Sequence, residues 1–164
     1  MEYFEKFDKL CKALGTGGAF LAVTGENGKT NIMTIGWAQV GYIWGKPVMS
    51  VLVRPSRYTH ALMEKAGCFT VCVPPEGKMR KELAFCGSKS GRDHDKAKEC
   101  GFSIKEGQGG TRYIAGSELV YECRILEHTG VQPSVLAQSV KDAFYKDGDY
   151  HTVYFGEIIG VHDL

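Results

Sequence analysis

Residues 31–37 read Asn-Ile-Met-Thr-Ile-Gly-Trp and follow a turn, residues 26–29, that reads Glu-Asn-Gly-Lys. The short apolar run 19–24 lies on the other side of that turn. Asn-Gly between two such runs is a strong signal for a β-hairpin. The sequence therefore predicts two paired antiparallel strands here, and the rest of the chain is interpreted outward from them.

The second strand of this hairpin has no ionisable side chain. A flat heteroaromatic ligand with polar edges is well served by strand N–H and C=O groups, by the small Gly36, and by the soft Met33 or the aromatic Trp37. The alternative interpretation is that Met33, Ile35 and Trp37 form an alternating core face. Both interpretations remain open at this point.

Residues 53–59, Val-Arg-Pro-Ser-Arg-Tyr-Thr, concentrate cations and hydroxyls where a strand is expected to lead into a helix. Arg54 precedes a proline and is expected to be extended, and Ser56 is a plausible N-cap for a helix over residues 57–65. Two guanidiniums, hydroxyl donors and the free N–H groups of a helix start suit a phosphate monoester. The alternative is a solvated turn with two surface arginines. The Gly-Lys-Ser/Thr ending of a Walker loop is absent.

Residues 86–96, Cys-Gly-Ser-Lys-Ser-Gly-Arg-Asp-His-Asp-Lys, form a second possible anion cradle. Glycines allow close backbone approach, serines donate hydrogen bonds, and Lys89, Arg92 and Lys96 supply positive charge. A mobile, charged surface loop is the alternative. His94 stands between two aspartates, but no further ligand follows at a fixed spacing, so no metal site is predicted.

The remaining pattern predicts a mainly β chain with short helices. Apolar residues at helical spacing indicate an amphipathic helix over 2–14, ended by Gly15 and the Gly17-Gly18 pair. Further expected elements are strands at 48–53, 68–73, 119–128 and 150–162, the last broken by Gly156 and Gly160; helices at 78–85 and 95–100; a loop at 41–47; a turn at 107–111; and an ambiguous segment at 133–144. Strands that follow one another through turns favour an antiparallel barrel with helices outside it.

The 164 residues are expected to form a single domain, 1–164. The formal net charge of +1 indicates no general attraction to nucleic acid or anionic lipid. No apolar run reaches the ~18 residues of a membrane span, and the charged N-terminus does not resemble a signal peptide. The six cysteines lack paired spacing; Cys68 and Cys72 lie about 13 Å apart along one strand. They are interpreted as reduced core residues of a cytoplasmic protein.

His151 precedes the apolar run Val153-Tyr154-Phe155 and is a titratable group that could face a cleft. The alternative is an exposed or structurally bonded histidine. A nucleophilic cysteine–histidine pair has no local signature in this sequence.

Taken together, the motifs resemble the flavin reductase-like family of FMN-binding split barrels, in particular its flavoredoxin-like branch. The stretches that carry the resemblance are 31–37, Gly45-Lys46-Pro47, 53–59, 86–93 with Asp95-Lys96, and 150–158, in this order. The resemblance covers roughly residues 15–164. It implies a Greek-key antiparallel split barrel, a homodimer, and FMN bound noncovalently near the subunit interface.

By position, the resemblance places the 31–37 residues on the isoalloxazine ring, the 54–59 residues on the ribityl phosphate, and the 86–96 residues as a cover over the phosphate. The cofactor-binding residues implied are Asn31, Met33, Thr34, Ile35, Gly36, Trp37, Arg54, Ser56, Arg57, Thr59, Cys86, Ser88, Ser90, Gly91 and Lys96. His151 is the candidate catalytic residue, a polar group at the open face of the flavin that contacts the donor or shuttles a proton.

The implied activity is that of an NAD(P)H-dependent flavin reductase, in which the flavin carries the redox chemistry. The glycine fingerprint of a separate nicotinamide domain is missing from the sequence, so NAD(P)H is expected to dock directly over the flavin. The alternatives are an electron carrier reduced by a partner redox protein, and a non-catalytic flavin-binding module. No nucleic-acid or membrane partner is expected.

Overall fold

The hairpin predicted from Asn27-Gly28 starts the sheet. In the structure, a computed structural model that describes residues 3–163, β1 (Ala19–Thr24) pairs antiparallel with β2 (Thr30–Ile35). Leu21 lies opposite Met33 in the register. The sequence-based expectation for this pair of strands is therefore confirmed.

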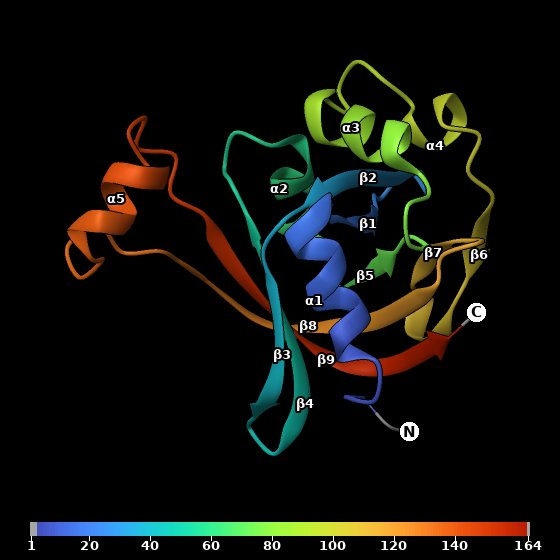
Figure 1. Cartoon of the computed structure of the whole chain (residues 1–164), viewed down its shortest axis with the longest axis horizontal. Coiled ribbons are helices and arrows are strands. Elements are labelled where there is room, and N and C mark those ends of the chain that lie inside the picture. Colours follow the sequence, from blue (N-terminus) through green and yellow to red (C-terminus); the bar gives the residue numbers. More distant parts are fainter. Residues whose placement is uncertain (1–2, 164) are drawn as a thin grey trace.

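Seven strands form one antiparallel sheet in the order β2-β1-β5-β8-β9-β4-β3 (Figure 1). Two short strands, β6 and β7, form a separate ladder. The strands that follow β2 are β3 (Ala38–Ile43), β4 (Lys46–Val53), β5 (Cys68–Val73), β6 (Ile104–Glu106), β7 (Arg112–Ile114), β8 (Leu119–Gly130) and β9 (Thr152–Asp163). The predicted class, mainly antiparallel β with short helices, is confirmed, and the sheet has the character of a split barrel.

The split lies between β2 and β3, which follow each other in the chain yet lie at opposite ends of the strand order. Within residues 3–163, β2 pairs only with β1, so its other edge carries backbone N–H and C=O groups that no strand uses. Such groups need partners from side chains, water or a ligand. The free edge of β2 is therefore a natural place for a planar ligand with polar edges.

Alternation along the strands builds two apolar clusters on opposite faces of the sheet. Leu21, Met33 and Val51 belong to the larger cluster inside the barrel, which α1 (Phe7–Thr16) closes with Leu10. Phe20 and Ile32 belong to a smaller cluster beneath α3 (Arg80–Ser88). Because successive strand side chains point to opposite faces, both faces of the β1–β2 hairpin are buried and its register is well specified.

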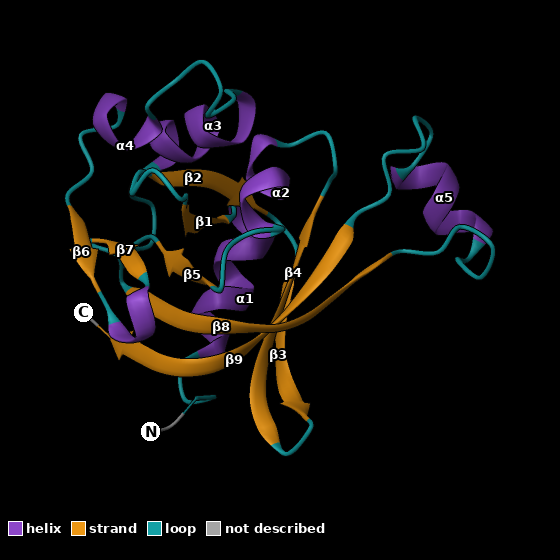
Figure 2. Cartoon of the chain, turned by 180° about the vertical axis from the view of Figure 1, so that it is seen from behind, coloured by secondary structure: helices purple, strands orange, loops and turns teal. Residues whose placement is uncertain are grey.

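Helices α1 to α4 lie against the sheet, whereas α5 stands away from it (Figure 2). Their bounds are α1 Phe7–Thr16, α2 Tyr58–Met63, α3 Arg80–Ser88, α4 Lys96–Glu99 and α5 Gln138–Phe144, with a short 3-10 turn at Gln108–Gly110. None of the helices described within residues 3–163 is long and apolar enough to cross a bilayer.

Two segments stand away from the body, namely the β3–β4 hairpin and the arm that carries α5 at the ends of β8 and β9 (Figure 1). The loop predicted at 41–47 is wrong, because the chain continues as β3 into β4 through Trp44 and Gly45. Both turn residues have positive φ, 54° and 70°, which is the geometry of a tight two-residue hairpin turn.

The predicted break of the last strand at its glycines is also wrong. β9 is continuous, and the glycines allow neighbouring side chains to approach closely. A Cβ on Gly156 would lie 2.7 Å from the Phe69 ring, and one on Gly160 would lie 2.6 Å from Glu122 Oε1. The strand pairing, not the strand itself, is irregular: the register between β8 and β9 shifts at Glu122/Cys123 and between Ile125 and Glu127.

Helix boundaries were less predictable than strands. The first helix runs to Thr16 and includes Gly15, while the first residue of the predicted range lies outside the described residues. The helix predicted over 57–65 is shorter, and its N-cap position is Arg57 rather than Ser56. The ambiguous segment 133–144 contains α5, and the 107–111 turn contains the 3-10 turn.

Candidate functional site

An edge cleft of about 210 Å³ opens where β2 ends at the split of the barrel. Its lining residues are Met33, Thr34, Ile35, Gly36, Trp37, Leu52, Arg54, Arg57 and His151. Five of them are consecutive, so the cleft follows the backbone of the predicted stretch past the end of the strand. A Cβ on Gly36 would meet no atom within 4 Å. The space over this residue is therefore open to a ligand.

The interpretation of Met33, Ile35 and Trp37 as a core face holds for the first two, which are buried in the larger cluster. Trp37 is 38% exposed at the cleft. Thr34 points to the opposite face, where its hydroxyl donates to the Leu83 carbonyl at 2.6 Å. The cleft therefore combines an apolar floor, an anchored strand end and one exposed aromatic ring.

His151 lies against Trp37, with ring centroids 4.9 Å apart, and its Nδ1 is 2.7 Å from the Tyr145 hydroxyl. Burial first, and then the nearby Arg54 charge, lower the pKa of His151 to about 4. The imidazole is therefore neutral across the physiological range. A neutral histidine can accept or donate a hydrogen bond in the cleft without adding charge to it.

Arg54 lines the edge cleft, but its guanidinium is directed towards the arm of α5. It donates to the Asp149 carbonyl at 2.9 Å and to the Phe144 carbonyl at 2.8 Å. It also stacks over Tyr145, 5.1 Å from the ring centroid. The structure thus places Arg54 as a clamp on the segment that brings His151 to the cleft.

A second hollow, the anion cradle, has a volume of about 160 Å³ between the start of α2 and the loop after α3. Its lining residues are Ser56, Arg57, Tyr58, Thr59, Ser88, Lys89, Ser90, Gly91, Arg92 and Lys96. The two predicted anion-binding stretches therefore meet in space, although about thirty residues of sequence separate them. Four of the ten side chains are cationic, which favours an anionic ligand.

Arg57 lines both the edge cleft and the anion cradle. Its guanidinium donates to the Gly87 carbonyl at 2.9 Å and lies 3.4 Å from the Cys86 carbonyl. Burial lowers its pKa from the usual value, yet an arginine remains charged. One ligand that reached from the cleft to the cradle would pass this residue.

Lys96 is the most enclosed cation of the cradle, only 4% exposed, and its Nζ donates to the Cys86 carbonyl at 2.9 Å. Burial, together with the nearby Arg57 charge, lowers the pKa of Lys96 to about 8. The position therefore has a surplus of positive charge that a bound anion would compensate. Cys86 itself is buried and contributes its carbonyl, not its thiol, to this arrangement.

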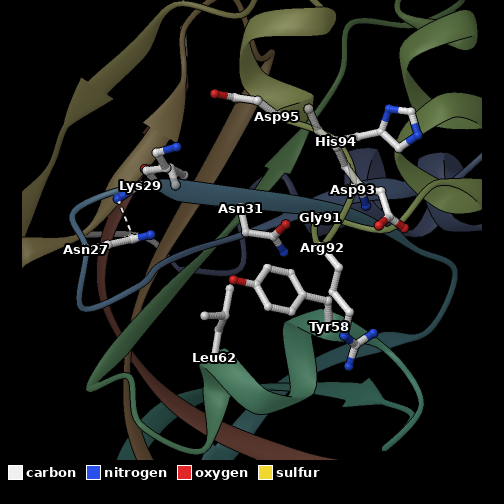
Figure 3. Close-up of a pocket in the computed structure, with 12 residues that line it drawn as sticks. Asn27, Lys29, Asn31, Tyr58, Leu62, Gly91, Arg92, Asp93, His94 and Asp95 are labelled. Carbon is white, nitrogen blue, oxygen red and sulfur yellow. Dashed lines mark hydrogen bonds between the residues drawn. The ribbon is translucent and has the colours of Figure 1, made fainter.

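Gly91 closes the cradle against β2. A Cβ there would lie 2.0 Å from Asn31 Oδ1 and 2.7 Å from Tyr58 Cδ1, so no larger residue fits. Figure 3 shows Asn31 between the Tyr58 ring and the loop that carries Gly91, with Arg92 beside that ring. Asn31 Nδ2 donates to Thr59 Oγ1 at 2.8 Å. Asn31 thus lies at the cradle side and lines an adjoining cavity of about 260 Å³, not the edge cleft.

The serines of the two stretches differ in their partners. Ser56 Oγ donates to Asp149 Oδ2 at 2.5 Å, which ties α2 to the α5 arm instead of capping the helix. Ser88 Oγ donates to the Ala84 carbonyl at 2.8 Å within α3, and Ser90 Oγ accepts the Arg92 N–H at 3.1 Å. Both face the cradle from the loop side.

Lys89 and Arg92, which were expected to supply positive charge, line the cradle. Two lining residues were not predicted, Leu52 and Tyr58. Tyr58 lies inside the stretch 53–59, so its neighbours in the sequence already pointed to it. Leu52 follows from strand alternation, because Val51 and Val53 point into the core and leave it on the other face.

His94 pairs with Glu99, with its Nδ1 3.0 Å from Oε1, and lies at the adjoining cavity. Over residues 3–163, no group of three or more histidine, cysteine, aspartate or glutamate side chains has the arrangement of a metal site.

A comparison with protein families finds one match over residues 13–163, to the flavin reductase like domain. Among curated proteins, an uncharacterized protein of Archaeoglobus fulgidus is 27% identical over 143 residues, which covers 87% of this chain and 70% of that protein.

Solved structures with the same fold include two that are at least 25% identical. The FMN-binding protein from Thermus thermophilus, solved with bound 1-cyclohex-2-enone, has a TM-score of 0.70 and 25% identity, over 89% of this chain and 69% of its own. Flavoredoxin from Methanosarcina acetivorans has a TM-score of 0.71 and 26% identity, over 90% of this chain and 68% of its own. Nitrilotriacetate monooxygenase component B from Bacillus cereus, at 13% identity and a TM-score of 0.70, shares the fold.

Proposed function

Because the chain belongs to the flavin reductase like domain family, we propose that it binds FMN noncovalently and acts as an oxidoreductase. The ring would lie in the edge cleft against the backbone of residues 33–37, and the phosphate would lie in the anion cradle. The observation that carries this proposal is that Arg57 lines both hollows. Usual ligand pockets have volumes of about 300–1,000 Å³, so an elongated ligand that spans both hollows fits better than a small one in either.

The residues present fit this cofactor. A flavin needs hydrogen-bonding groups along the edge of its ring, and β2 has a free backbone edge beside the cleft. A phosphate monoester carries about −1.5 to −2 charge, and Arg57, Lys89, Arg92 and Lys96 face the cradle. Burial, and after it the nearby Arg57 charge, lower the pKa of Lys96, so an anion bound beside it would stabilise the charged form of this lysine.

When bound, FMN supplies two-electron redox chemistry; the chain supplies position, charge and shielding. Arg57 and Lys96 hold the phosphate, and Gly36 leaves room for the ring. Trp37 and the neutral His151 border the open side of the cleft, where a donor would approach. His151 would contact the donor by a hydrogen bond from its neutral imidazole.

For the donor we propose NADH or NADPH, docked directly over the flavin. The test is anaerobic mixing of the FMN-loaded protein with each nicotinamide, followed by flavin absorbance near its visible maximum. We expect rapid bleaching with at least one of them. Bleaching no faster than that of free FMN with the same nicotinamide would contradict the reductase function.

A second candidate is an electron carrier that receives electrons from a redox protein. It is favoured by the likeness to the flavoredoxin of Methanosarcina acetivorans. The same anaerobic absorbance measurement distinguishes the two functions. The flavin of a carrier would bleach with a reduced ferredoxin and stay oxidised with both nicotinamides. A protein that holds FMN and is bleached by neither class of donor would be a binding module.

We also propose that two copies of the chain associate. The β3–β4 hairpin and the α5 arm project from the body (Figure 2), and they carry large exposed apolar side chains. Tyr42 and Trp44 are 70% and 57% exposed, and Val135 and Phe144 are 81% and 49% exposed. Large apolar side chains exposed on projecting segments are typical of an interaction surface, and a second copy offers the same segments in return.

Sedimentation of the purified protein tests this assembly. A dimer is expected, and Trp44→Glu should convert it to monomer by placing a charge in the apolar interface. Lys105→Glu, on the short β6 strand, is the matched control and should leave the dimer intact. A wild-type monomer that still binds FMN would contradict the proposed assembly while leaving the cofactor proposal standing.

A further inference from the structure

Two cysteines that the sequence spacing did not connect lie in contact beneath the anion cradle. The sulfurs of Cys86 and Cys100 are 3.9 Å apart. Cys86 is buried in α3, and Cys100, which is partly exposed, follows directly after α4. Both are free thiols in the structure.

The pair spans the loop that forms the cradle. Residues 88–92 and Lys96, which face the proposed phosphate position, all lie between the two cysteines in the chain. The Cys86 carbonyl accepts the Lys96 ammonium at 2.9 Å, and the Cys100 N–H donates to the Lys96 carbonyl at 3.0 Å. A change in the separation of the two cysteines therefore acts directly on Lys96.

We propose that Cys86 and Cys100 are a redox-active dithiol that a peroxide closes to a disulfide, and that this cross-link holds the cradle shut and slows the release of FMN. The first half of the proposal stands on the contact between the sulfurs. The second half rests on the proposed position of the FMN phosphate. The shift required is small, because the sulfurs must approach from 3.9 Å to about 2.05 Å.

The reaction balances with hydrogen peroxide as the oxidant. The thiolate of Cys100, the more accessible cysteine, attacks one peroxide oxygen; the O–O bond breaks, and a sulfenic acid and water form. The Cys86 sulfur then attacks the sulfenic sulfur, the S–S bond forms, the S–O bond breaks, and the oxygen leaves as a second water with the Cys86 proton. Two thiols and one peroxide thus give one disulfide and two waters.

The surroundings make this a slow reaction. Burial, with the neighbouring Cys100 sulfur, raises the pKa of Cys86 to about 12, and burial also raises the pKa of Cys100. Because the thiolate is the reacting form, closure should accelerate as pH rises. Such a pair would respond to sustained oxidation and not to a brief exposure.

The effect on FMN follows from the position of the cross-link. For the phosphate to leave, the loop after α3 must move away from the start of α2 or the phosphate must slip past it. A bond between the two ends of that loop removes much of its freedom to open. The cross-linked cradle should therefore release FMN more slowly, while the edge cleft is unchanged.

Tryptic mapping tests the first half. Cleavage after Lys81, Lys89, Lys98 and Lys105 leaves Cys86 and Cys100 on separate peptides, so a disulfide appears as a linked pair that dithiothreitol separates. We expect this pair after incubation with peroxide, in the wild type and in Cys11→Ser, and not in Cys100→Ser. Oxidation of Cys11 or Cys68 with no linked pair would overturn the proposal.

The release of FMN, followed by the recovery of flavin fluorescence after dilution, tests the second half. Release from the oxidised wild type should be at least threefold slower than from the reduced protein, reversible with dithiothreitol, and unchanged by peroxide in Cys100→Ser. A linked pair with an unchanged release rate would overturn the coupling to the cradle. A protein that forms the linked pair but binds no FMN would instead contradict the proposed function.

Discussion

The edge cleft and the anion cradle are adjacent, but they are built in different ways. The cleft follows five consecutive residues of one strand end, 33–37, over an apolar floor. The cradle joins the start of α2 to a loop about thirty residues later, and four of its ten lining residues are cationic. One hollow is therefore shaped by local backbone, and the other by tertiary contact between two charged segments.

Because of this difference, the two hollows are expected to bind different parts of the ligand. The cleft offers main-chain hydrogen bonds and apolar surface, which a flavin ring would use whether or not a phosphate is attached. The cradle offers charge, which only the phosphate would use. Comparison of FMN with riboflavin, which lacks the phosphate, therefore measures the two regions separately.

The largest effect is expected from Arg57→Ala. Loss of a charge-assisted hydrogen bond costs about 1.5–3 kcal/mol, and this residue is the one that lines both hollows. We expect FMN affinity to fall about 100-fold, near the upper limit of that range, and riboflavin affinity to fall only about threefold, the size of one weak neutral hydrogen bond. Fluorescence titration of the apoprotein with each flavin measures both constants.

Arg54→Ala is the matched control for this variant. Since the Arg54 guanidinium donates to the Phe144 and Asp149 carbonyls, its loss should loosen the α5 arm and affect both flavins equally. The sequence alone suggested that both arginines hold the phosphate. A loss that is selective for FMN and larger in Arg54→Ala than in Arg57→Ala would show that Arg54 holds the phosphate. It would contradict the separation of a ring-binding cleft from a phosphate-binding cradle.

Gly36→Ala should produce the complementary effect in the cleft. The new methyl group meets no protein atom within 4 Å, so it occupies the space proposed for the ring without straining the fold. Overpacking costs about 1–3 kcal/mol, and we expect about a tenfold loss for FMN and riboflavin alike. Gly67→Ala, also in open space, is the control. A loss confined to FMN would show that the ring lies elsewhere.

How much of this could be predicted differs between the two regions, for a physical reason. The Asn-Gly turn set the β1–β2 pairing and its register, and alternation along β2 placed Met33 and Ile35 correctly in the core. Local pattern is enough for the part of the cleft that one strand end forms, whereas Leu52, Arg54, Arg57 and His151 reach the cleft from other segments. The convergence of residues 56–59 with 88–96 depends on tertiary packing, which no local pattern encodes, and it was reached only through the family resemblance.

The errors have the same origin. Arg54 was grouped with Arg57 because they are neighbours in sequence, whereas the carbonyls that hold Arg54 belong to the α5 arm, about ninety residues away. The loop predicted at 41–47 is a hairpin because Trp44 adopts a positive φ of 54°, which is uncommon for a bulky residue. The contact between Cys86 and Cys100 has no signature in their spacing.

A moderate effect, dependent on pH, is expected from Lys96. Its ammonium is protonated below its pKa of about 8, and the second phosphate pKa is about 6, so FMN should bind best between these values. Above pH 8 the lysine becomes neutral, and affinity should fall by up to about tenfold, the lower limit for one charged hydrogen bond. Riboflavin affinity should stay constant over the same range.

Lys96→Gln should remove this decline and leave a flat FMN profile from pH 7 to 9. Lys98→Gln, on the exposed side of the same short helix, is the control and should keep the wild-type shape. If the decline persisted in Lys96→Gln, the titrating group would be another residue, and the surplus charge of the cradle would lie elsewhere.

The smallest effect is expected from His151, and here the prediction is the absence of a titration. Because burial and Arg54 lower the pKa of His151 to about 4, the imidazole stays neutral from pH 5.5 to 8. Anaerobic bleaching rates with the preferred nicotinamide should show no inflection near pH 6.5 that depends on this residue.

His151→Gln should lower the rates by no more than about threefold, the size of one neutral hydrogen bond at its weaker limit, with a parallel pH profile. An inflection near 6.5 in the wild type that vanished in the variant would mean that a charged imidazole lies at the cleft. The contrast between a cleft whose histidine is neutral and a cradle lined by four cations would then fail.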